Sequence, residues 1–143
     1  MEITNFKLEA DAYRKILRIL SSLCENSKVE SVFLINRNGQ EIARHGEAAS
    51  LDVQALASLA ASNLAAALGL TSLVGETDLE RVYQRGERFG VLVTPAGEYA
   101  LLLLVIEVKN ERTLDARNLK QAVLVLADIL SKCTQRVEVT EEF

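Results

Sequence analysis

Hydrophobic positions follow first a helical and then a strand-like spacing along the chain. Over residues 6–24 they lie three and four apart, which predicts an amphipathic helix. Residues 29–36 are apolar on both faces, as in a strand covered on both sides, and the chain returns over 40–45 after Asn38-Gly39. This dipeptide predicts a type I′ hairpin turn, because both of its residues tolerate a positive φ.

The rest of the pattern predicts two helices and three strands. They are a helix over 52–70 with Ser50 as candidate N-cap, strands over 79–85, 88–94 and 98–107, and a last helix capped by Thr113 that ends near 133. The first of these strands is rich in charge, which is typical of a sheet edge. The order is then α-β-β-α-β-β-β-α.

This order predicts one three-layer domain. Each link between successive strands is a tight turn, so the sheet is expected to be antiparallel, with helices on both of its faces. We therefore expect an α/β fold of the α+β type over residues 1–143. Its core would run from about 6 to 133, and residues 134–143 would form a short, acidic, mobile tail.

The segment from Val53 to Gly75 contains no charged side chain and no histidine. A surface helix normally keeps a charged face, and this one has none. One stripe of the helix is apolar: Val53, Leu56, Ala57, Ala60, Leu64, Ala67 and Leu68. Further apolar residues lie elsewhere around it: Ala55, Leu59, Ala66 and Leu70.

Three explanations of this segment compete. A transmembrane helix is disfavoured, because alanine dominates and polar residues interrupt the run. Burial within the chain would need a third layer of structure above the helix, which 143 residues hardly supply. An interface in which small residues let another helix approach is favoured, and homodimerisation is its simplest form.

Composition narrows the function classes. The chain has 16 Lys and Arg against 20 Asp and Glu, a net charge of −4, without a basic tract. This balance disfavours nucleic acid and anionic membrane surfaces as main partners. The chain starts with Met1 and Glu2 rather than with a secretory signal pattern, so we expect a cytoplasmic protein.

Candidate chemistry is sparse. The single histidine, His45, follows a predicted strand and is expected to be an exposed loop-edge residue rather than a catalytic or metal-binding one. No familiar catalytic, phosphate-binding or metal-binding motif is found, so we expect no metal and no cofactor. Cys24 and Cys133 end helices on one sheet face, and we expect them to be reduced core thiols that lie close together.

An ordered set of segments resembles the Roadblock/LC7 family. The central helix carries Leu51-Asp52, Leu56-Ala57-Ser58-Leu59 and Ala61-Ser62-Asn63; the other matches are 32–36 with Asn38-Gly39, the turn 84–90 and the strand 101–106. Together they cover about residues 8–133. Within the family the chain is most similar to the bacterial MglB group, partners of the Ras-like GTPase MglA.

The resemblance implies a fold and a function. It implies a five-stranded antiparallel sheet with the central helix on one face and the terminal helices on the other, and a homodimer formed through the central helix and an edge strand. It further implies a GTPase-activating role in cell polarity and motility, in which the GTPase's own residues are aligned without an inserted arginine. The chain would have no catalytic residues of its own. MglB proteins often carry a longer C-terminal extension, which here is only about ten residues.

Two other functions stay open. A scaffold of the same fold could tether a GTPase or other regulators without speeding hydrolysis. A ligand sensor of the PAS or GAF kind would need a cavity ringed by polar groups, whereas the predicted sheet centre is solid Leu and Val.

The predicted interaction residues lie on the central helix and near one turn. Dimer and partner contacts are expected at Ala55, Ser58, Leu59, Ala61, Ser62, Ala65, Ala66 and Leu70, with flanking contacts at Arg85, Glu87 and Arg88. Ser58, Ala61, Ser62 and Ala65 are expected on the upper side that meets the GTPase. Arginines at the edge strand are expected to prevent aggregation rather than to act as an arginine finger.

Overall fold

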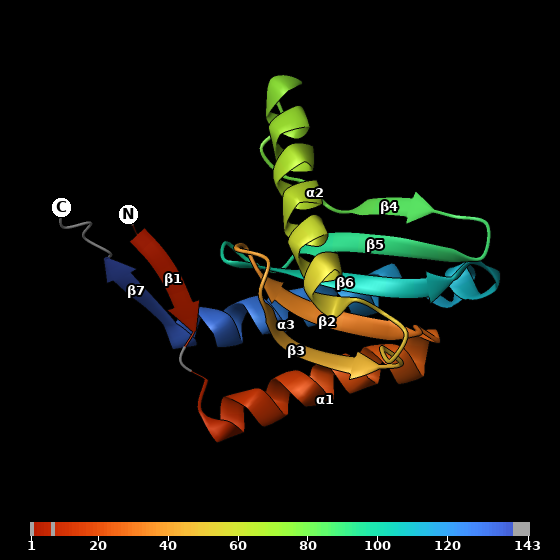
Figure 1. The fold of residues 1–143 in the computed structure, drawn as a ribbon, viewed down its shortest axis with the longest axis horizontal. Helices are drawn as coiled ribbons and strands as arrows, with labels where there is room; N and C mark the ends of the chain where they lie inside the picture. The colour runs from red at the N-terminus through yellow and green to blue at the C-terminus, as the bar shows by residue number, and fades with distance from the viewer. Residues whose placement is uncertain (1, 7, 139–143) are drawn as a thin grey trace.

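The computed structural model describes residues 2–6 and 8–138. Five antiparallel strands form one sheet in the order β3-β2-β6-β5-β4, crossed by a long helix (Figure 1). The elements are β1 (Glu2–Phe6), α1 (Ala10–Ser27), β2 (Ser31–Asn36), β3 (Glu41–Gly46), α2 (Val53–Leu73), β4 (Val82–Arg85), β5 (Phe89–Pro95), β6 (Ala100–Glu107), the 3-10 helix η1 (Val108–Thr113), α3 (Ala116–Cys133) and β7 (Thr134–Glu138). The predicted five-stranded sheet and its order of elements are confirmed.

The sheet has a hydrophobic layer on each face. Alternate residues of β6 point to opposite faces, as the pleat requires. Leu102, Leu104 and Ile106 pack with α1 and α3, whereas Leu101 and Leu103 pack with α2. Because β6 is the central strand, it is buried on both sides, which explains why its sequence is continuously apolar.

The turn between β2 and β3 differs from the type I′ turn expected from the sequence. Only Gly39 in this loop has a positive φ, of 84°. Asn36 N–H donates to the Gln40 carbonyl oxygen (2.9 Å) and Gly39 N–H to the Asn36 carbonyl oxygen (3.1 Å), so the loop has three residues. Asn36 selects this geometry, because its side-chain oxygen accepts hydrogen bonds from the N–H groups of Asn38 (3.0 Å) and Gln40 (2.9 Å).

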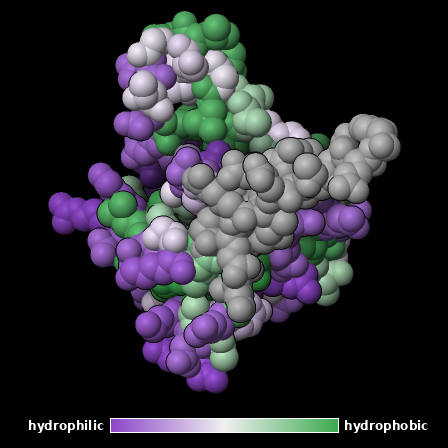
Figure 2. All heavy atoms as spheres, turned by 90° about the vertical axis from the view of Figure 1, so that its left-hand side faces the viewer, coloured by the Kyte–Doolittle hydropathy of each residue, from purple (hydrophilic) through white to green (hydrophobic). Residues whose placement is uncertain are grey.

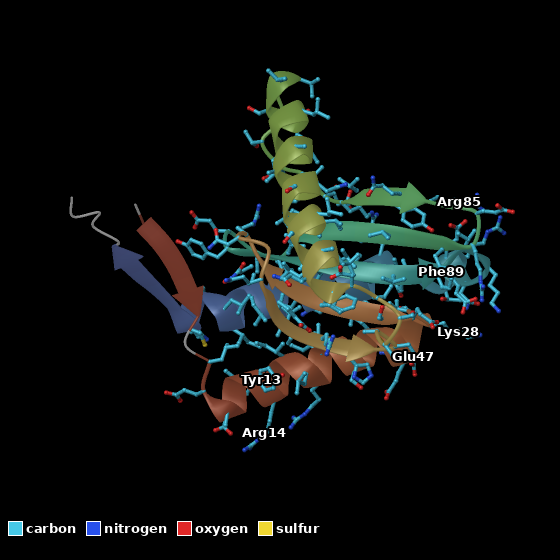
Figure 3. The ribbon with its side chains drawn as sticks, in the orientation of Figure 1. Tyr13, Arg14, Lys28, Glu47, Arg85 and Phe89 are labelled. Carbon is cyan, nitrogen blue, oxygen red and sulfur yellow. The ribbon has the colours of Figure 1, made fainter. Side chains whose placement is uncertain are left out.

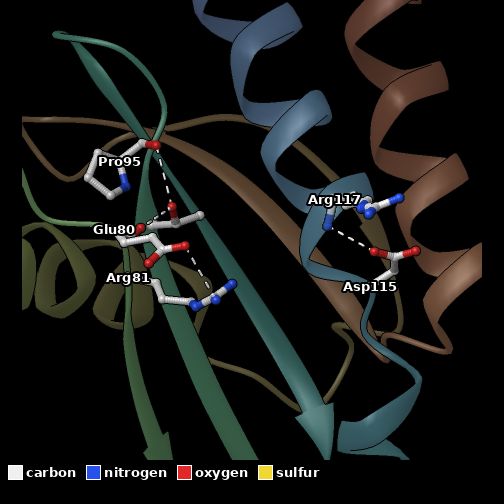
Figure 4. A network of polar contacts seen from close by, with 6 residues as sticks. Glu80, Arg81, Pro95, Asp115 and Arg117 are labelled. Atoms are coloured by element: carbon white, nitrogen blue, oxygen red, sulfur yellow. Dashed lines mark hydrogen bonds and ion pairs between the residues drawn. The ribbon is translucent and has the colours of Figure 1, made fainter.

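Two helix starts also differ from expectation. Asp52, not Ser50, is the N-cap of α2, and its carboxylate accepts a hydrogen bond from Ala55 N–H at 3.1 Å. Thr113 does not cap α3, because η1 intervenes; its hydroxyl instead donates to the Ser27 carbonyl oxygen at the end of α1 (2.6 Å). Asp115 accepts from Arg117 N–H (2.8 Å) at the start of α3 (Figure 4).

The two ends of the chain pair with each other outside the main sheet. β1 runs antiparallel to β7, from Glu2 opposite Glu138 to Phe6 opposite Thr134. The residues expected to begin a tail at 134 form strand β7 over 134–138, whereas 139–143 lie outside the described residues. Each strand has only five residues and mixed polarity, so neither carries a strand-like pattern that stands out without its distant partner.

Candidate interaction site

Helix α2 lies across the strands and extends past the edge of the sheet formed by β4 (Figure 1). Its buried residues, Ala57, Ala60 and Leu64, all belong to its first twelve positions. Other residues of the apolar stripe predicted from the sequence, including Val53, Leu56 and Leu68, are half-buried and pack on the hydrophobic cluster between α2 and the sheet. The N-terminal half of α2 is thus anchored on the sheet, and the C-terminal half overhangs it.

The overhanging half of α2 is apolar and exposed. The exposed fractions are 67% for Leu70, 85% for Leu73 and 78% for Val74. Hydrophobic colour gathers on this part of the molecule, above the sheet (Figure 2). Exposed apolar side chains clustered at one site indicate a surface that another molecule covers.

The predicted residues of α2 lie on its exposed side with one exception. Ala55, Ser58, Leu59, Ser62, Ala65, Ala66 and Leu70 are exposed. Ala61 is half-buried and packs against the cluster beneath α2, so the expectation that it lies on the upper side is wrong. The helical period explains this, because Ala61 is four residues from buried Ala57 and three from buried Leu64.

The exposed residues divide into two flanks of α2. Leu59, Ala66 and Leu70 are spaced seven and four apart and share one flank, whereas Ser58, Ser62 and Ala65 are spaced four and three apart and share the other. Each flank borders a hollow. The first hollow, beside β4 and β5, has a volume of about 470 Å³, and the second, beside the β2–β3 turn, of about 580 Å³.

The hollow beside β4 and β5 has a mainly apolar floor. Phe89, Val91 and Val93 form part of this floor, and Leu59 and Asn63 of α2 line its wall. The Asn63 side-chain amide donates to the Gln84 side-chain oxygen (3.0 Å), which ties α2 to the edge strand. We call this hollow the edge groove.

Arg85 is oriented away from α2. Its Nε–H lies 3.1 Å from both carboxylate oxygens of Glu111 in η1, and the Tyr83 hydroxyl donates to the same carboxylate at 2.7 Å. Successive side chains of a strand alternate between faces, so Gln84 meets α2 while its two neighbours meet η1 on the other face. The Tyr83 hydrogen bond and Arg85 together lower the pKa of Glu111, and burial raises the pKa of Tyr83.

Arg88 and Glu87 lie in the β4–β5 turn. Arg88 stacks its guanidinium over the Phe89 ring, 5.1 Å from the centroid, and Glu87 is exposed. Figure 3 shows Arg85 and Phe89 at the same end of the sheet. Arg88 thus contacts Phe89, which lines the edge groove, whereas Arg85 borders the groove itself but has its Nε paired with Glu111 on the opposite face.

Hydrogen bonds also fix the approach to β4. The Thr94 hydroxyl of β5 donates to the Glu80 carbonyl oxygen (2.9 Å), and Arg81 pairs with the Glu80 carboxylate at 3.4 Å (Figure 4). No sequence pattern predicts the first of these contacts, because it joins two distant segments through a main-chain oxygen. The Thr94 hydrogen bond ties the segment that precedes β4 to β5.

Other candidate chemistry is limited. Within residues 2–6 and 8–138, no three His, Cys, Asp or Glu side chains come together as metal ligands. His45 is exposed on β3. In the described part of the chain, α2 alone is long and apolar enough to cross a membrane, which is weak evidence because core helices of water-soluble proteins pass the same test.

The two cysteines are not neighbours. Helices α1 and α3 run antiparallel: α1 runs from left to right and α3 from right to left toward β7 (Figure 1). Cys24 and Cys133, near the C-terminal ends of their helices, therefore lie at opposite ends of this layer. Both are half-buried and free, and burial raises the pKa of Cys24 to about 11.

Comparison with known proteins gives a consistent result. The family model described as Roadblock/LC7 domain matches residues 15–107. A solved structure of MglB with a tetrameric arrangement superposes with a TM-score of 0.82 and 29% identity, and the match covers 90% of this chain and 97% of that one.

Two further MglB structures are similar. The gliding protein MglB of Thermus thermophilus gives a TM-score of 0.80 at 28% identity and covers 90% of this chain and 97% of its own. Myxococcus xanthus MglB gives 0.77 at 29% identity and covers 82% and 96%. Among curated sequences no protein matches significantly.

Proposed function

The chain belongs to the Roadblock/LC7 domain family, and from this premise we propose that it is a homodimeric regulator of a small Ras-like GTPase of the MglA type. The observation that carries the proposal is that helix α2, 21 residues long, has a broad exposed side without a charged side chain. The likeness to MglB structures over most of the chain supports it. A cytoplasmic location and a role in cell polarity and motility belong to the same proposal.

The proposed dimer joins two copies at the β4 edge. A two-fold axis there would bring the overhanging half of each α2 over the edge groove of the other copy. Leu70 and Leu73, exposed in one chain, would then meet Phe89 and Val91 of the second. The contact is reciprocal. Helix α2 of each copy extends past its own sheet, and the other copy covers that exposed part.

The edge strand would contribute main-chain hydrogen bonds to this dimer. β4 has a neighbour on only one side, β5, so its outer N–H and C=O groups are available to a second β4. Pairing the two edges would give a continuous sheet beneath two adjacent α2 helices. Leu59 and Ala66 line the flank of α2 that would face the second helix.

The GTPase would bind on the other flank. Ser58, Ser62 and Ala65 are small and uncharged, so a partner backbone can approach closely. The adjoining hollow beside the β2–β3 turn adds surface, which is needed because a stable interface covers about 800 Å² per partner. The segment 70–77 is the first proposed flanking contact. The Gly86–Arg88 turn borders the edge groove on the other flank, so it is a flanking contact for a GTPase that straddles both α2 helices of the proposed dimer.

The proposed activity requires binding alone. An isolated Ras-like GTPase is slow because its water-orienting residue and arginine are misplaced, and ordering them supplies about 10³- to 10⁵-fold in rate. A regulator without catalytic residues achieves this when it binds the aligned, transition-state arrangement of the GTPase more tightly than the resting GTP state. We also expect it to prefer the GTP form over the GDP form, because only a difference in affinity between states can shift a switch. Arg85 is held by Glu111 on the opposite face, which disfavours it as an arginine finger.

GTP turnover by an MglA-type GTPase, measured with and without this protein, tests the proposal. Turnover is expected to rise by at least about tenfold, a modest share of the range that GTPase activation reaches. Ala65→Arg should abolish both binding and stimulation, whereas Ala10→Arg, a matched change on exposed α1, should leave both intact. Arg85→Ala and Arg88→Ala should change stimulated turnover by less than about threefold.

Each other outcome has a defined meaning. Binding without stimulation would identify the alternative, a non-catalytic scaffold. Loss of turnover in Arg85→Ala or Arg88→Ala with binding retained would identify an arginine finger supplied in trans. The absence of any binding, with the protein folded and dimeric, would reject the GTPase proposal. A sensor of the PAS or GAF kind lacks support, because both sheet faces are filled by packed Leu and Val.

A further inference from the structure

A second groove lies on the face of the molecule opposite α2. It runs between α1 and α3 and has a volume of about 600 Å³. These helices lie side by side beneath the sheet (Figure 4, brown and blue). Its floor is apolar and includes Ile19, Leu23, Val125 and Ile129, of which Val125 remains 38% exposed. We call it the α1–α3 groove.

The two rims of the α1–α3 groove differ in charge. Lys15 and Arg18 line the α1 rim, are exposed, and form no ion pair with any described residue. On the α3 rim, Asp128 is already paired with Lys132 at 3.2 Å. The chain as a whole is acidic, so this α1 rim is a local positive site rather than part of a basic surface.

The walls of the groove select a helix as the occupant. Both walls are interiors of helices, whose main-chain groups are already hydrogen-bonded to each other. An extended peptide would find no main-chain partners there, whereas a helix brings its own hydrogen bonds. The lining of α1 from Lys15 to Asn26 spans about 16 Å at about 1.5 Å per residue, which accommodates about three turns of helix.

A second copy of this chain fits less well. Its corresponding face has the same concave shape, and two facing grooves leave a void between them. The α1–α3 groove is also separated by the whole sheet from the proposed dimer and GTPase surfaces.

We propose that the α1–α3 groove binds an amphipathic helix of another protein, with apolar residues along one stripe and acidic residues on the side that faces Lys15 and Arg18. The apolar stripe, spaced three and four apart, packs on Ile19, Val125 and Ile129. The acidic residues pair with the two unpaired cations. This inference rests on a face separate from the proposed function: the chain would bind a second protein in the α1–α3 groove while the α2 face stays available for the proposed dimer and GTPase.

A displayed library of helical peptides of about 14 residues, selected on the purified protein, tests this inference. The selected peptides are expected to share an i, i+3, i+7 apolar pattern flanked by Glu or Asp. In fluorescence anisotropy, Val125→Asp should weaken their binding by at least about tenfold, as for a contact at the centre of an interface. Leu124→Asp should leave it unchanged, because Leu124 is 57% exposed on the same helix and does not line the groove.

A charge reversal provides the second arm and does not touch the core. The double variant Lys15→Glu with Arg18→Glu should prefer a peptide whose acids are replaced by Lys, by about tenfold over the original. The inference is overturned if no peptide is selected, if selected peptides tolerate Val125→Asp, or if the reversal leaves the preference unchanged. A change of oligomeric state in Val125→Asp would instead assign the groove to a second copy.

Discussion

Asn36 determines the shape of the β2–β3 turn, although the sequence pattern directs attention to Asn38-Gly39. The residue is 8% exposed, and its side chain accepts two main-chain hydrogen bonds. Asn36→Ala removes that acceptor, so we expect the free energy of unfolding to fall by about 1–2 kcal/mol. Asn38→Ala, at an exposed position, should change it by less than about 0.5 kcal/mol. Urea titration measures the free energy of unfolding of both variants. Equal losses in the two variants would contradict the role of Asn36 in the turn.

Cys24 introduces an alkaline limit to stability. Burial, with the charges of Glu25 and Glu30, raises its pKa from 9.0 to about 11. Between these values the unfolded chain has lost a proton that the folded chain keeps, so stability falls as pH rises from about 9 to about 11. Unfolding titrations at several pH values should show a shallower decline for Cys24→Ala than for the native chain. Identical slopes would remove Cys24 as the cause.

At the scale of elements, α2 couples the two proposed contacts through its opposite flanks. Leu59 is 69% exposed beside the edge groove, so Leu59→Glu alters no buried contact within one chain. In the proposed dimer it would bury a carboxylate without a partner, which costs several kcal/mol. We expect a folded monomer by light scattering at concentrations where the native chain is a dimer. A native chain that is itself monomeric at tens of micromolar would contradict the dimer.

The sequence predicted most elements because their signals are local. The continuous apolar run of β6 and the three–four spacing in α1 and α3 reflect burial that each element experiences directly. The predicted exposed side of α2 followed from the missing charges, and only Ala61 was misplaced, by part of a turn. The sequence could not predict the orientation of Arg85, because this side chain is held by Glu111, 26 positions away in the chain. The β1–β7 pair was missed for the same reason.

For the whole molecule, association and folding should be linked. If native α2 is covered only in the dimer, mass action stabilises the folded state as protein concentration rises. We expect the thermal midpoint to increase by about 2–4 °C per tenfold rise in concentration. Leu59→Glu serves as the control and should show no such dependence. Calorimetry of the native chain and of Leu59→Glu over a hundredfold range of protein concentration measures this dependence. A thermal midpoint of the native chain that does not change with concentration would contradict the linkage.

The absence of charge on α2 also bears on which chains can pair. Selectivity among related subunits commonly depends on like charges that repel the wrong partner, and the helix from Val53 to Leu73 offers none. In the proposed dimer, its exposed flank of Ala, Ser and Leu has no charge that would repel a chain of similar shape. If the proposed dimer forms, mixed dimers should therefore arise by subunit exchange in a cell that makes a paralogue of this protein. Each mixed dimer would present two different flanks to the proposed GTPase.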